Sequence, residues 1–393
     1  MVPRLTAGLV AALCSMAAFS QTSNNQSFVA TAGVTAPVAY VYVSAGTQIF
    51  AYSTSSSGTL TKISTTNVAV NIWHLTVTKK FLFGIDDASD IYTFAIQPNG
   101  GLVPLPVLNS ADYAPDTCYG SGIIQAEESG ENLYAETGSC HDGSFVSSFK
   151  ILPTGDLQYL GKAPVSSWVI SQLRFSDQTH YAYQTGCQIK EANNSATATA
   201  YTDTFKRESN GYLTYLGTSH DVPDGSGRKS FCPFTMASDS ANHLVFEYLR
   251  YMEPGTGGEF GEMYGGDSPL AVYTVASDGK ITTNSNYGNM AAAEVYPTTV
   301  SISPSNQVLA VGGDSSYQFF HFHGAASQPV KWTGVFSAGD SVIELGWDKA
   351  SHFYAMTPSS LVMYHITSTS YKQLTGLPGA FVNGNCFIVL SLQ

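Results

Sequence analysis

The sequence predicts an all-β fold, a seven-bladed β-propeller whose ring is closed by the C-terminal strand completing the first blade. Three observations support this prediction: the residue usage, a repeated strand pattern, and an unassigned apolar strand at the C-terminus. Tyr (23), Phe (21) and Gly (36) are abundant, whereas only 12% of the residues are charged. This usage is typical of short pleated strands joined by tight turns.

The repeat is clearest in residues 80–102, KFLFGIDDASDIYTFAIQPNGGL. This stretch reads as an apolar strand, an acidic loop, an alternating strand and a Gly turn. The first of these strands recurs seven times, at 39–45, 80–86, 132–138, 180–186, 243–249, 308–314 and 352–358. Repeats large enough to hold four strands indicate a propeller, and a pair of β-sandwiches is the alternative.

Each repeated strand is the expected middle strand of a blade and is followed by an outer strand. In five blades a Gly-x-apolar turn comes next, and a tight hairpin there requires positive φ. These turns contain Gly58, Gly100, Gly155, Gly211 and Gly279. Candidate innermost strands precede the middle strands of blades two to seven, at 73–79, 120–127, 170–176, 234–240, 299–305 and 342–348.

Blade one has no candidate innermost strand before Ala39, while the apolar segment 386–392 has no blade of its own. Pairing this segment with the first blade accounts for both facts. It also removes an open sheet edge that would otherwise invite aggregation. We therefore expect the C-terminal strand to close the ring.

The N-terminus resembles a secretory signal peptide, with Arg4 before an apolar run and small residues before a polar stretch. We expect a signal peptide over 1–20, a flexible linker over 21–37 and the propeller over 38–393. A lipoprotein signal centred on Cys14 is disfavoured by Leu13, because a small residue is needed before the cysteine. The apolar run is short for a membrane span, so we expect a secreted or periplasmic protein without a transmembrane segment.

Seventeen basic and twenty-nine acidic residues give a formal net charge of -12. A nucleic-acid backbone would be repelled by this charge, so we exclude nucleic acid as a partner. The expected partner is a small molecule, a glycan or a protein that binds at the channel face, and we expect a monomer.

Two segments resemble a known family: NIWHLTVTKKFLFGIDD (71–87) and AETGSCHDGSFVSSFKILPTGDL (135–157). They are similar to blade motifs of the lactonase-type propellers, the 6-phosphogluconolactonase-like family related to the YVTN propellers. The resemblance extends over most of the chain in short motifs. It implies a seven-bladed propeller and, for members that act on lactones, a site at the channel mouth built from a His, two Arg and a Glu.

This chain keeps one of those four positions. Glu247, in VFEYL, matches the family's Glu, but Phe231 and Cys232 stand where the resemblance implies Arg and His. The His of the four-residue site falls at Ser171 and its second Arg near Asp314, whereas Cys232 stands at the His that follows Arg in the family's strand motif. Lactone hydrolysis needs a base for water and a group that stabilises the oxyanion, so these departures argue against the family's standard mechanism.

The channel mouth is nevertheless the expected ligand site, because concave propeller mouths collect polar and aromatic side chains. We expect it where innermost strands start and middle strands end. The ligand-binding candidates there are Trp73, His74, Asp86, Asp87, His141, Asp314 and Glu344, and Glu247 is the catalytic candidate; Asp90, Tyr119 and Asp142 lie nearby. A lone histidine such as His74 is more often a structural residue than a general base.

No cofactor or metal is predicted. The loop DDASD (86–90) offers carboxylates to calcium, but it lacks the spacing of a recognised calcium loop, which favours solvated loop acids. The Gly-rich insertion 249–269 is long enough to act as a lid over the channel or to be a loose excursion. Nucleophile-elbow, phosphate-loop and zinc-helix motifs are absent from the sequence.

Export makes disulfides plausible. Antiparallel counting across a hairpin turning at 129–130 places Cys118 opposite about His141, which favours a Cys118–Cys140 bridge. Cys187 and Cys232 form a possible second pair, with less support. Cys386 is left over, and a free buried thiol is the preferred interpretation.

Three functions remain open. The first is a noncatalytic exported propeller that binds a ligand at its channel face, and it is favoured by the loss of three of the four family positions. The second is a divergent lactone hydrolase that uses Glu247 with unfamiliar partners. The third is a purely structural envelope protein.

Overall fold

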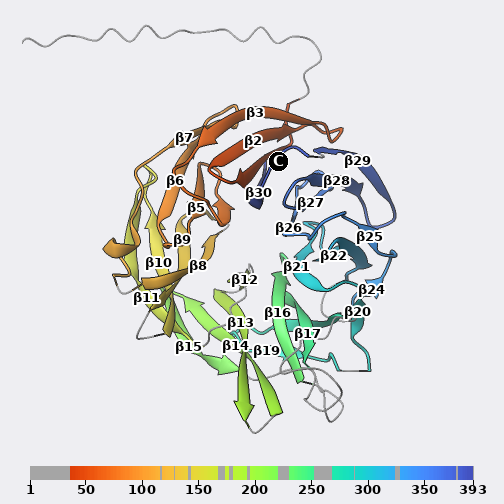
Figure 1. Cartoon of the computed structure of the whole chain (residues 1–393). Helices are drawn as coiled ribbons and strands as arrows, with labels where there is room; N and C mark the ends of the chain where they lie inside the picture. Colours follow the sequence, from red (N-terminus) through yellow and green to blue (C-terminus); the bar gives the residue numbers. More distant parts are fainter. Residues whose placement is uncertain are drawn as a thin grey trace, which may run out of the picture. The chain divides into compact units, whose positions relative to one another are not determined.

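The computed structural model describes residues 36–392, except 116, 128, 140–142, 167–172, 177–179, 193–194, 220–229, 252–267, 287, 324–327 and 378. The unit Ala36–Gln393 contains seven antiparallel sheets arranged as a ring around a central channel, as Figure 1 shows. The predicted seven-bladed propeller is therefore confirmed.

Blades 1 to 3 follow the predicted strand order. From the channel outward, blade 1 contains β30 (Gly384–Ser391), β1 (Ala39–Ala45), β2 (Gln48–Thr54) and β3 (Leu60–Asn67). Blade 2 contains β4 (His74–Val77), β5 (Phe81–Ile85), β6 (Ile91–Ile96) and β7 (Leu102–Pro104). A 3₁₀ turn, η1 (Ser110–Asp112), leads to blade 3, which contains β8 (Thr117–Ala126), β9 (Asn132–Ser139), β10 (Gly143–Ile151) and β11 (Leu157–Val165).

Blades 4 to 7 repeat this order, and blades 5 and 6 each add one short strand. Blade 4 contains β12 (Arg174–Ser176), β13 (Tyr181–Ala192), β14 (Ser195–Arg207) and β15 (Leu213–Ser219). Blade 5 contains β16 (Ser230–Ser238), β17 (His243–Tyr251), β18 (Ser268–Val275), β19 (Ile281–Thr283) and β20 (Ala291–Ala293). Blade 6 contains β21 (Pro297–Ile302), β22 (Val308–Gly313), β23 (Ser316–His321), β24 (Val330–Lys331) and β25 (Phe336–Ser337). Blade 7 contains β26 (Glu344–Trp347), β27 (His352–Met356), β28 (Leu361–Ile366) and β29 (Tyr371–Leu377).

The ring is closed between the two ends of the propeller sequence. Strand β30 pairs antiparallel with β1, with Ala39 opposite Ser391 and Val43 opposite Phe387. Figure 1 shows β30 beside the channel, inside β2 and β3. The C-terminal strand thus supplies the innermost strand of blade 1, which confirms the predicted closure.

The apolar core consists of seven clusters, and each lies between two neighbouring blades. Strand β1 shows why each cluster lies between two blades. Tyr40 and Tyr42 belong to the cluster shared with blade 2, whereas Val41 and Val43 belong to the cluster shared with blade 7. Successive strand residues face opposite sides of a sheet, so a blade packed on both sides needs a nearly continuous apolar middle strand.

The predicted turn glycines have positive φ, from 80° at Gly58 to 92° at Gly155. These turns also bind the neighbouring blade. The hydroxyls of Tyr42 and Tyr183 donate to the carbonyls of Gly100 and Gly279, at 3.2 and 2.8 Å. A side chain in place of Gly279 would meet the ring of Tyr181 at 2.5 Å. Glycine is therefore needed for the turn and for its close contact with the preceding blade.

Candidate functional site

The central channel contains a cavity of about 530 Å³. Each of the seven innermost strands contributes to its wall: β4, β8, β12, β16, β21, β26 and β30. The lining continues onto the turns that follow β16, β21 and β26, where Ser240 and Lys349 are exposed. The described cavity therefore extends from the first residues of the innermost strands, such as His74 and Glu344, to the turns at the other end of these strands.

Arg174, the first residue of β12, brings a cation to the cavity wall. Its Nε donates to the carbonyl of Met236 at 3.0 Å, and its Nη1 lies 3.5 Å from Oε1 of Gln125. These contacts connect blade 4 with blades 5 and 3. Burial lowers the pKa of Arg174 to about 10, against the opposing effect of Glu344. The guanidinium therefore remains charged at neutral pH.

A second cavity, of about 320 Å³, adjoins the first. Five residues line both of them, namely Gln125, Arg174, Ser238, Ile388 and Val389. Arg174 thus stands where two parts of the channel meet, so a molecule that fills either part would lie close to its charge.

Glu344 is the first residue of β26 and lines the larger cavity. Its Oε2 accepts a hydrogen bond from the backbone N–H of Phe387 in β30, at 2.8 Å. Burial raises the pKa of Glu344 to about 7, although this hydrogen bond and the charge of Arg174 both lower it. The carboxyl group holds the closing strand and can also change its charge near neutral pH.

His74, the first residue of β4, lines the same cavity. Burial, followed by repulsion from Arg174, lowers the pKa of His74 to about 4. Its imidazole is therefore neutral at physiological pH and can donate or accept a hydrogen bond. The cavity brings together a cation, an ionisable carboxyl, a neutral imidazole and an amide from four different blades.

Glu247, the predicted catalytic residue, lies elsewhere. It is in the middle strand β17, opposite Thr235 and Leu270, and it is fully buried. Within the described part of the chain, neither carboxyl oxygen has a hydrogen-bond partner, and Glu247 lines neither channel cavity. Burial raises the pKa of Glu247 well above its usual value, and no nearby charge contributes. Burial therefore favours the neutral form of this carboxyl.

The other ligand-binding candidates are dispersed. Trp73, Asp87 and Asp314 are exposed and do not line either channel cavity, and Trp73 is 44% exposed. Asp86 is buried and its Oδ1 accepts the backbone N–H groups of Ala88 and Asp90. It therefore shapes its own turn. His141 lies outside the described residues.

Arg174 and Gln125 line the cavity but were not among the sequence candidates. In the sequence, Arg174 lies between Leu173 and Phe175 in a strand pattern that leaves its direction open, and Gln125 carries no signal. Both lie on predicted innermost strands, which is the one feature of the sequence that could have selected them. Innermost strands form the channel wall, so every polar residue on them deserves consideration as a lining residue.

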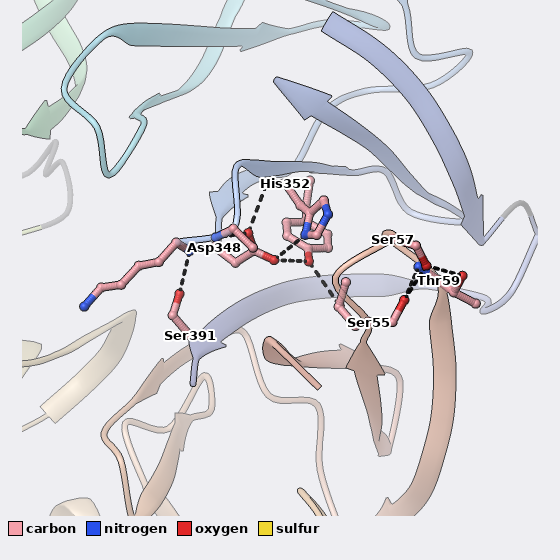
Figure 2. A network of polar contacts seen from close by, with 10 residues as sticks. Ser55, Ser57, Thr59, Asp348, His352 and Ser391 are labelled. Carbon is pink, nitrogen blue, oxygen red and sulfur yellow. Dashed lines mark hydrogen bonds and ion pairs between the residues drawn. The ribbon is translucent and has the colours of Figure 1, made fainter. Parts of the chain in front are cut away.

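A second polar network lies at the junction of blades 7 and 1 (Figure 2). Oδ2 of Asp348 lies 2.7 Å from Nδ1 of His352 and 2.9 Å from the hydroxyl of Tyr354. That hydroxyl is also 3.0 Å from Oγ1 of Thr54 in blade 1. All four side chains are buried, so the network holds two blades together and is not open to a ligand.

The predicted disulfides stay predictions. Strand β8 contains bulges, and Thr117 pairs with Ser139 while Tyr119 pairs with Gly138, so Cys118 is not opposite residue 141 as the hairpin count assumed. Cys140 lies outside the described residues, and the side chain of Cys187 does as well. Cys232 is buried and is not a free thiol. Cys386 is a free buried thiol, which agrees with the preferred interpretation.

Within the described ranges, no three or more His, Cys, Asp or Glu side chains group in a way that could hold a metal ion. The described residues also contain no helix with the length and apolar character that a membrane crossing needs.

Comparison with known proteins supports the fold. No family model and no curated protein sequence matches the chain. Solved structures do match: a protein from Lactobacillus plantarum has a TM-score of 0.62 at 12% identity, covering 91% of this chain and 100% of that one. A protein of unknown function from Desulfotomaculum acetoxidans has a TM-score of 0.60 at 11% identity, covering 88% and 98%.

A third solved structure, from Bacteroides fragilis, is named provisionally as a 6-phosphogluconolactonase. It has a TM-score of 0.59 at 12% identity and covers 90% of this chain and 98% of its own. The expected structural likeness to lactonase-type propellers is therefore found. At this identity the likeness concerns the fold alone.

Proposed function

We propose that this protein is an exported lactonase-like β-propeller that binds a small polar molecule inside its central channel without transforming it. The observation that carries the proposal is the cavity of about 530 Å³ in which Arg174, Glu344, His74 and Gln125 meet. Small-molecule sites are commonly about 300–1,000 Å³ and combine apolar walls with a few convergent polar groups. Ile124, Val300 and Ile388 supply apolar wall in this channel.

The size of the cavity favours a small molecule over a protein, and its polar groups favour a ligand with its own hydrogen-bonding groups. Export is supported by the N-terminal sequence pattern, and a monomeric state is part of the proposal. Binding without catalysis is supported by the position of Glu247. A fully buried carboxyl that does not line the cavity is poorly placed to serve as the base of the family's mechanism, and burial favours its neutral form.

A thermal-shift panel of sugars, sugar acids and lactones, followed by calorimetry of the hits, tests the proposal on the full chain. We expect at least one ligand to raise the melting temperature of the wild type and to lose most of its effect in Arg174→Met. Lys280→Met removes an exposed cation outside the channel and should bind normally. Ligands that bind equally well to Arg174→Met would contradict a channel site.

One observation favours a second candidate function, a divergent lactone hydrolase. Glu344, with its pKa raised to about 7, faces the same cavity as Arg174. The Glu344 carboxylate could take a proton from water while the water oxygen attacks the lactone carbonyl, and Arg174 could stabilise the oxyanion. Collapse would break the ring C–O bond, and the leaving oxygen would take the proton back from Glu344.

The two candidates differ in turnover. Acid release from a panel of lactones, followed at constant pH, should show none above the uncatalysed rate if the protein only binds. Turnover that is abolished by Glu344→Gln and kept by Glu247→Gln would establish the hydrolase.

A further inference from the structure

Arg174 and Glu344 face one cavity without forming an ion pair with each other. None of the ion pairs among the described residues joins them. Glu344 is instead bound to the N–H of Phe387, and Arg174 donates to the carbonyl of Met236. Each nevertheless shifts the pKa of the other, so their charges interact across the channel. A bound molecule can therefore affect this interaction by entering the space that both residues line.

The surroundings of Glu344 determine what happens when it changes charge. His74 faces the cavity from β4, Arg174 from β12 and Lys349 from the turn after β26. Asp239 also lines the cavity, but its oxygens accept bonds from its own turn and its Oδ2 lies 2.6 Å from Nδ1 of His243.

Among the described residues, Cys386 in β30 also lies near Glu344, and burial raises the pKa of its thiol well above the usual value. His74 is neutral above about pH 4 and Arg174 is charged below about pH 10. Between pH 6 and 8, Glu344 therefore changes charge while His74, Arg174 and Cys386 keep theirs. Lys349 is exposed, so solvent screens its charge.

Building on the function proposed above, we propose that the channel binds a small monoanion, such as a carboxylate, against Arg174, and that Glu344 takes up a proton as the anion binds. An ionised Glu344 repels an incoming anion and competes with it for electrostatic attraction to the guanidinium of Arg174. A protonated Glu344 does neither and can donate a hydrogen bond to the ligand. With Glu344 protonated and His74 neutral, Arg174 is the half-buried cation that the described channel wall presents to a ligand, which favours a monoanion over a polyanion.

The sign of the linkage follows from this competition. Binding stabilises the protonated form of Glu344, so affinity is high below pH 7 and falls as the pH rises through the pKa of Glu344. Coupling between two linked sites commonly amounts to about 5- to 150-fold in affinity. We expect the dissociation constant to rise roughly tenfold between pH 6 and 8, near the lower part of that range.

Isothermal titration calorimetry of the full chain tests the proposal, with acetate and lactate as monoanion probes and citrate as the polyanion. The wild type should bind a monoanion probe about tenfold more tightly at pH 6 than at pH 8, and should bind citrate more weakly. At pH 7, titrations in two buffers with different ionisation enthalpies should show proton uptake on binding.

Glu344→Gln keeps an acceptor oxygen for the N–H of Phe387 and mimics the protonated carboxyl. It should bind the monoanion with the same affinity at both pH values, close to the wild-type affinity at pH 6. Glu294→Gln removes an exposed carboxylate that pairs with Lys331 outside the channel, and it should behave like the wild type.

Wild-type binding that is independent of pH, or an undiminished pH dependence in Glu344→Gln, would overturn the proton linkage and leave the channel-binding function standing. If neither acetate nor lactate binds at either pH, the anion site is overturned, and the thermal-shift panel of neutral ligands then decides the proposed function separately. Should Glu344→Gln fail to fold, the proton uptake measured with the wild type decides the linkage.

Discussion

Blades 5 and 7 contain the same turn between their innermost and middle strands. In each, an Asp is followed four residues later by a His, and the Asp carboxylate accepts two backbone N–H groups of the turn while binding Nδ1 of that His. The pairs are Asp239 with His243 and Asp348 with His352. The turn is therefore stabilised by contacts within five consecutive residues, and the same contacts occur in both blades.

The blades differ two residues further along. Blade 5 has Val245 in the apolar cluster that it shares with blade 6, whereas blade 7 has Tyr354, whose hydroxyl contacts both Asp348 and Thr54 (Figure 2). Tyr354 extends the local turn into blade 1, across the junction where the two ends of the propeller meet. The turn thus stabilises only its own blade in blade 5, whereas in blade 7 it also contributes to ring closure.

Glu247, which is fully buried, and Glu344, which is partly buried, show a second difference between these blades. Burial raises the pKa of both Glu247 and Glu344, yet only Glu344 has a backbone donor and a nearby cation. Glu344 projects from an innermost strand into the channel, whereas Glu247 lies within blade 5 with no partner among the described residues. A raised pKa alone therefore does not identify a site, because burial produces it without any ligand chemistry.

The largest effect is expected from removing the strand that closes the propeller ring. Deleting residues 384–393 removes β30, exposes the edge of β1 and takes away the N–H that Glu344 binds. We expect aggregated or unfolded protein, because the ring opens between blades 7 and 1. Size-exclusion chromatography with light scattering and a thermal melt measure this, and removal of Gln393 alone is the control. An unchanged melting temperature in the long deletion would show that the junction does not depend on β30.

Asp348→Ala and Asp239→Ala compare the two turns directly. Each leaves backbone N–H groups without their acceptor, but Asp348→Ala also leaves the buried Tyr354 hydroxyl with one partner fewer. We expect a loss of about 3 kcal/mol in the free energy of unfolding for Asp348→Ala, and about 1 kcal/mol less for Asp239→Ala. Chemical denaturation measures both, and equal losses would mean that the junction adds nothing to the turn.

Glu247→Gln tests whether the carboxyl group of Glu247 destabilises the folded state. Burial favours the protonated form of Glu247 in the folded state, so the contribution of Glu247 to stability falls as the pH rises above the unfolded pKa, about 4.3, toward the raised folded value. At pH 8 we expect the variant to be more stable than the wild type by about 1 kcal/mol or more, since each pKa unit corresponds to about 1.4 kcal/mol.

The difference should nearly vanish at pH 4.5, so thermal melts at the two pH values provide the measurement. Glu294→Gln, at an exposed position, should change little at either pH. A wild type that is more stable than Glu247→Gln at pH 8 would indicate that Glu247 has an ionic role.

Tyr354→Phe should have the smallest effect. It removes only the hydroxyl that contacts Asp348 and Thr54 and leaves the ring in its apolar cluster. We expect a loss of about 1 kcal/mol, the usual net value of a buried hydrogen bond. Tyr371→Phe, in a side chain that is 46% exposed, should cost nothing measurable, and an equal loss in both variants would remove the special role assigned to Tyr354.

The sequence by itself determined the number of blades, the positions of the middle strands, the turn glycines and the closing strand. These features depend on short-range rules, because alternation of side chains and positive φ in a hairpin turn are decided within a few residues. The middle strand expected at 39–45 is β1 with the same limits, and Gly279 has the positive φ its turn required.

Only the tertiary structure decided which polar residues meet in the channel. His74, Arg174 and Glu344 are far apart in the chain, and they come together because each occupies an innermost strand of a closed ring. The family motif selected Glu247, since a motif records position along a strand and not the side of the blade that a side chain faces. Bulges such as those in β8 shift the register by single residues, and one residue is enough to move a side chain from one face of a blade to the other.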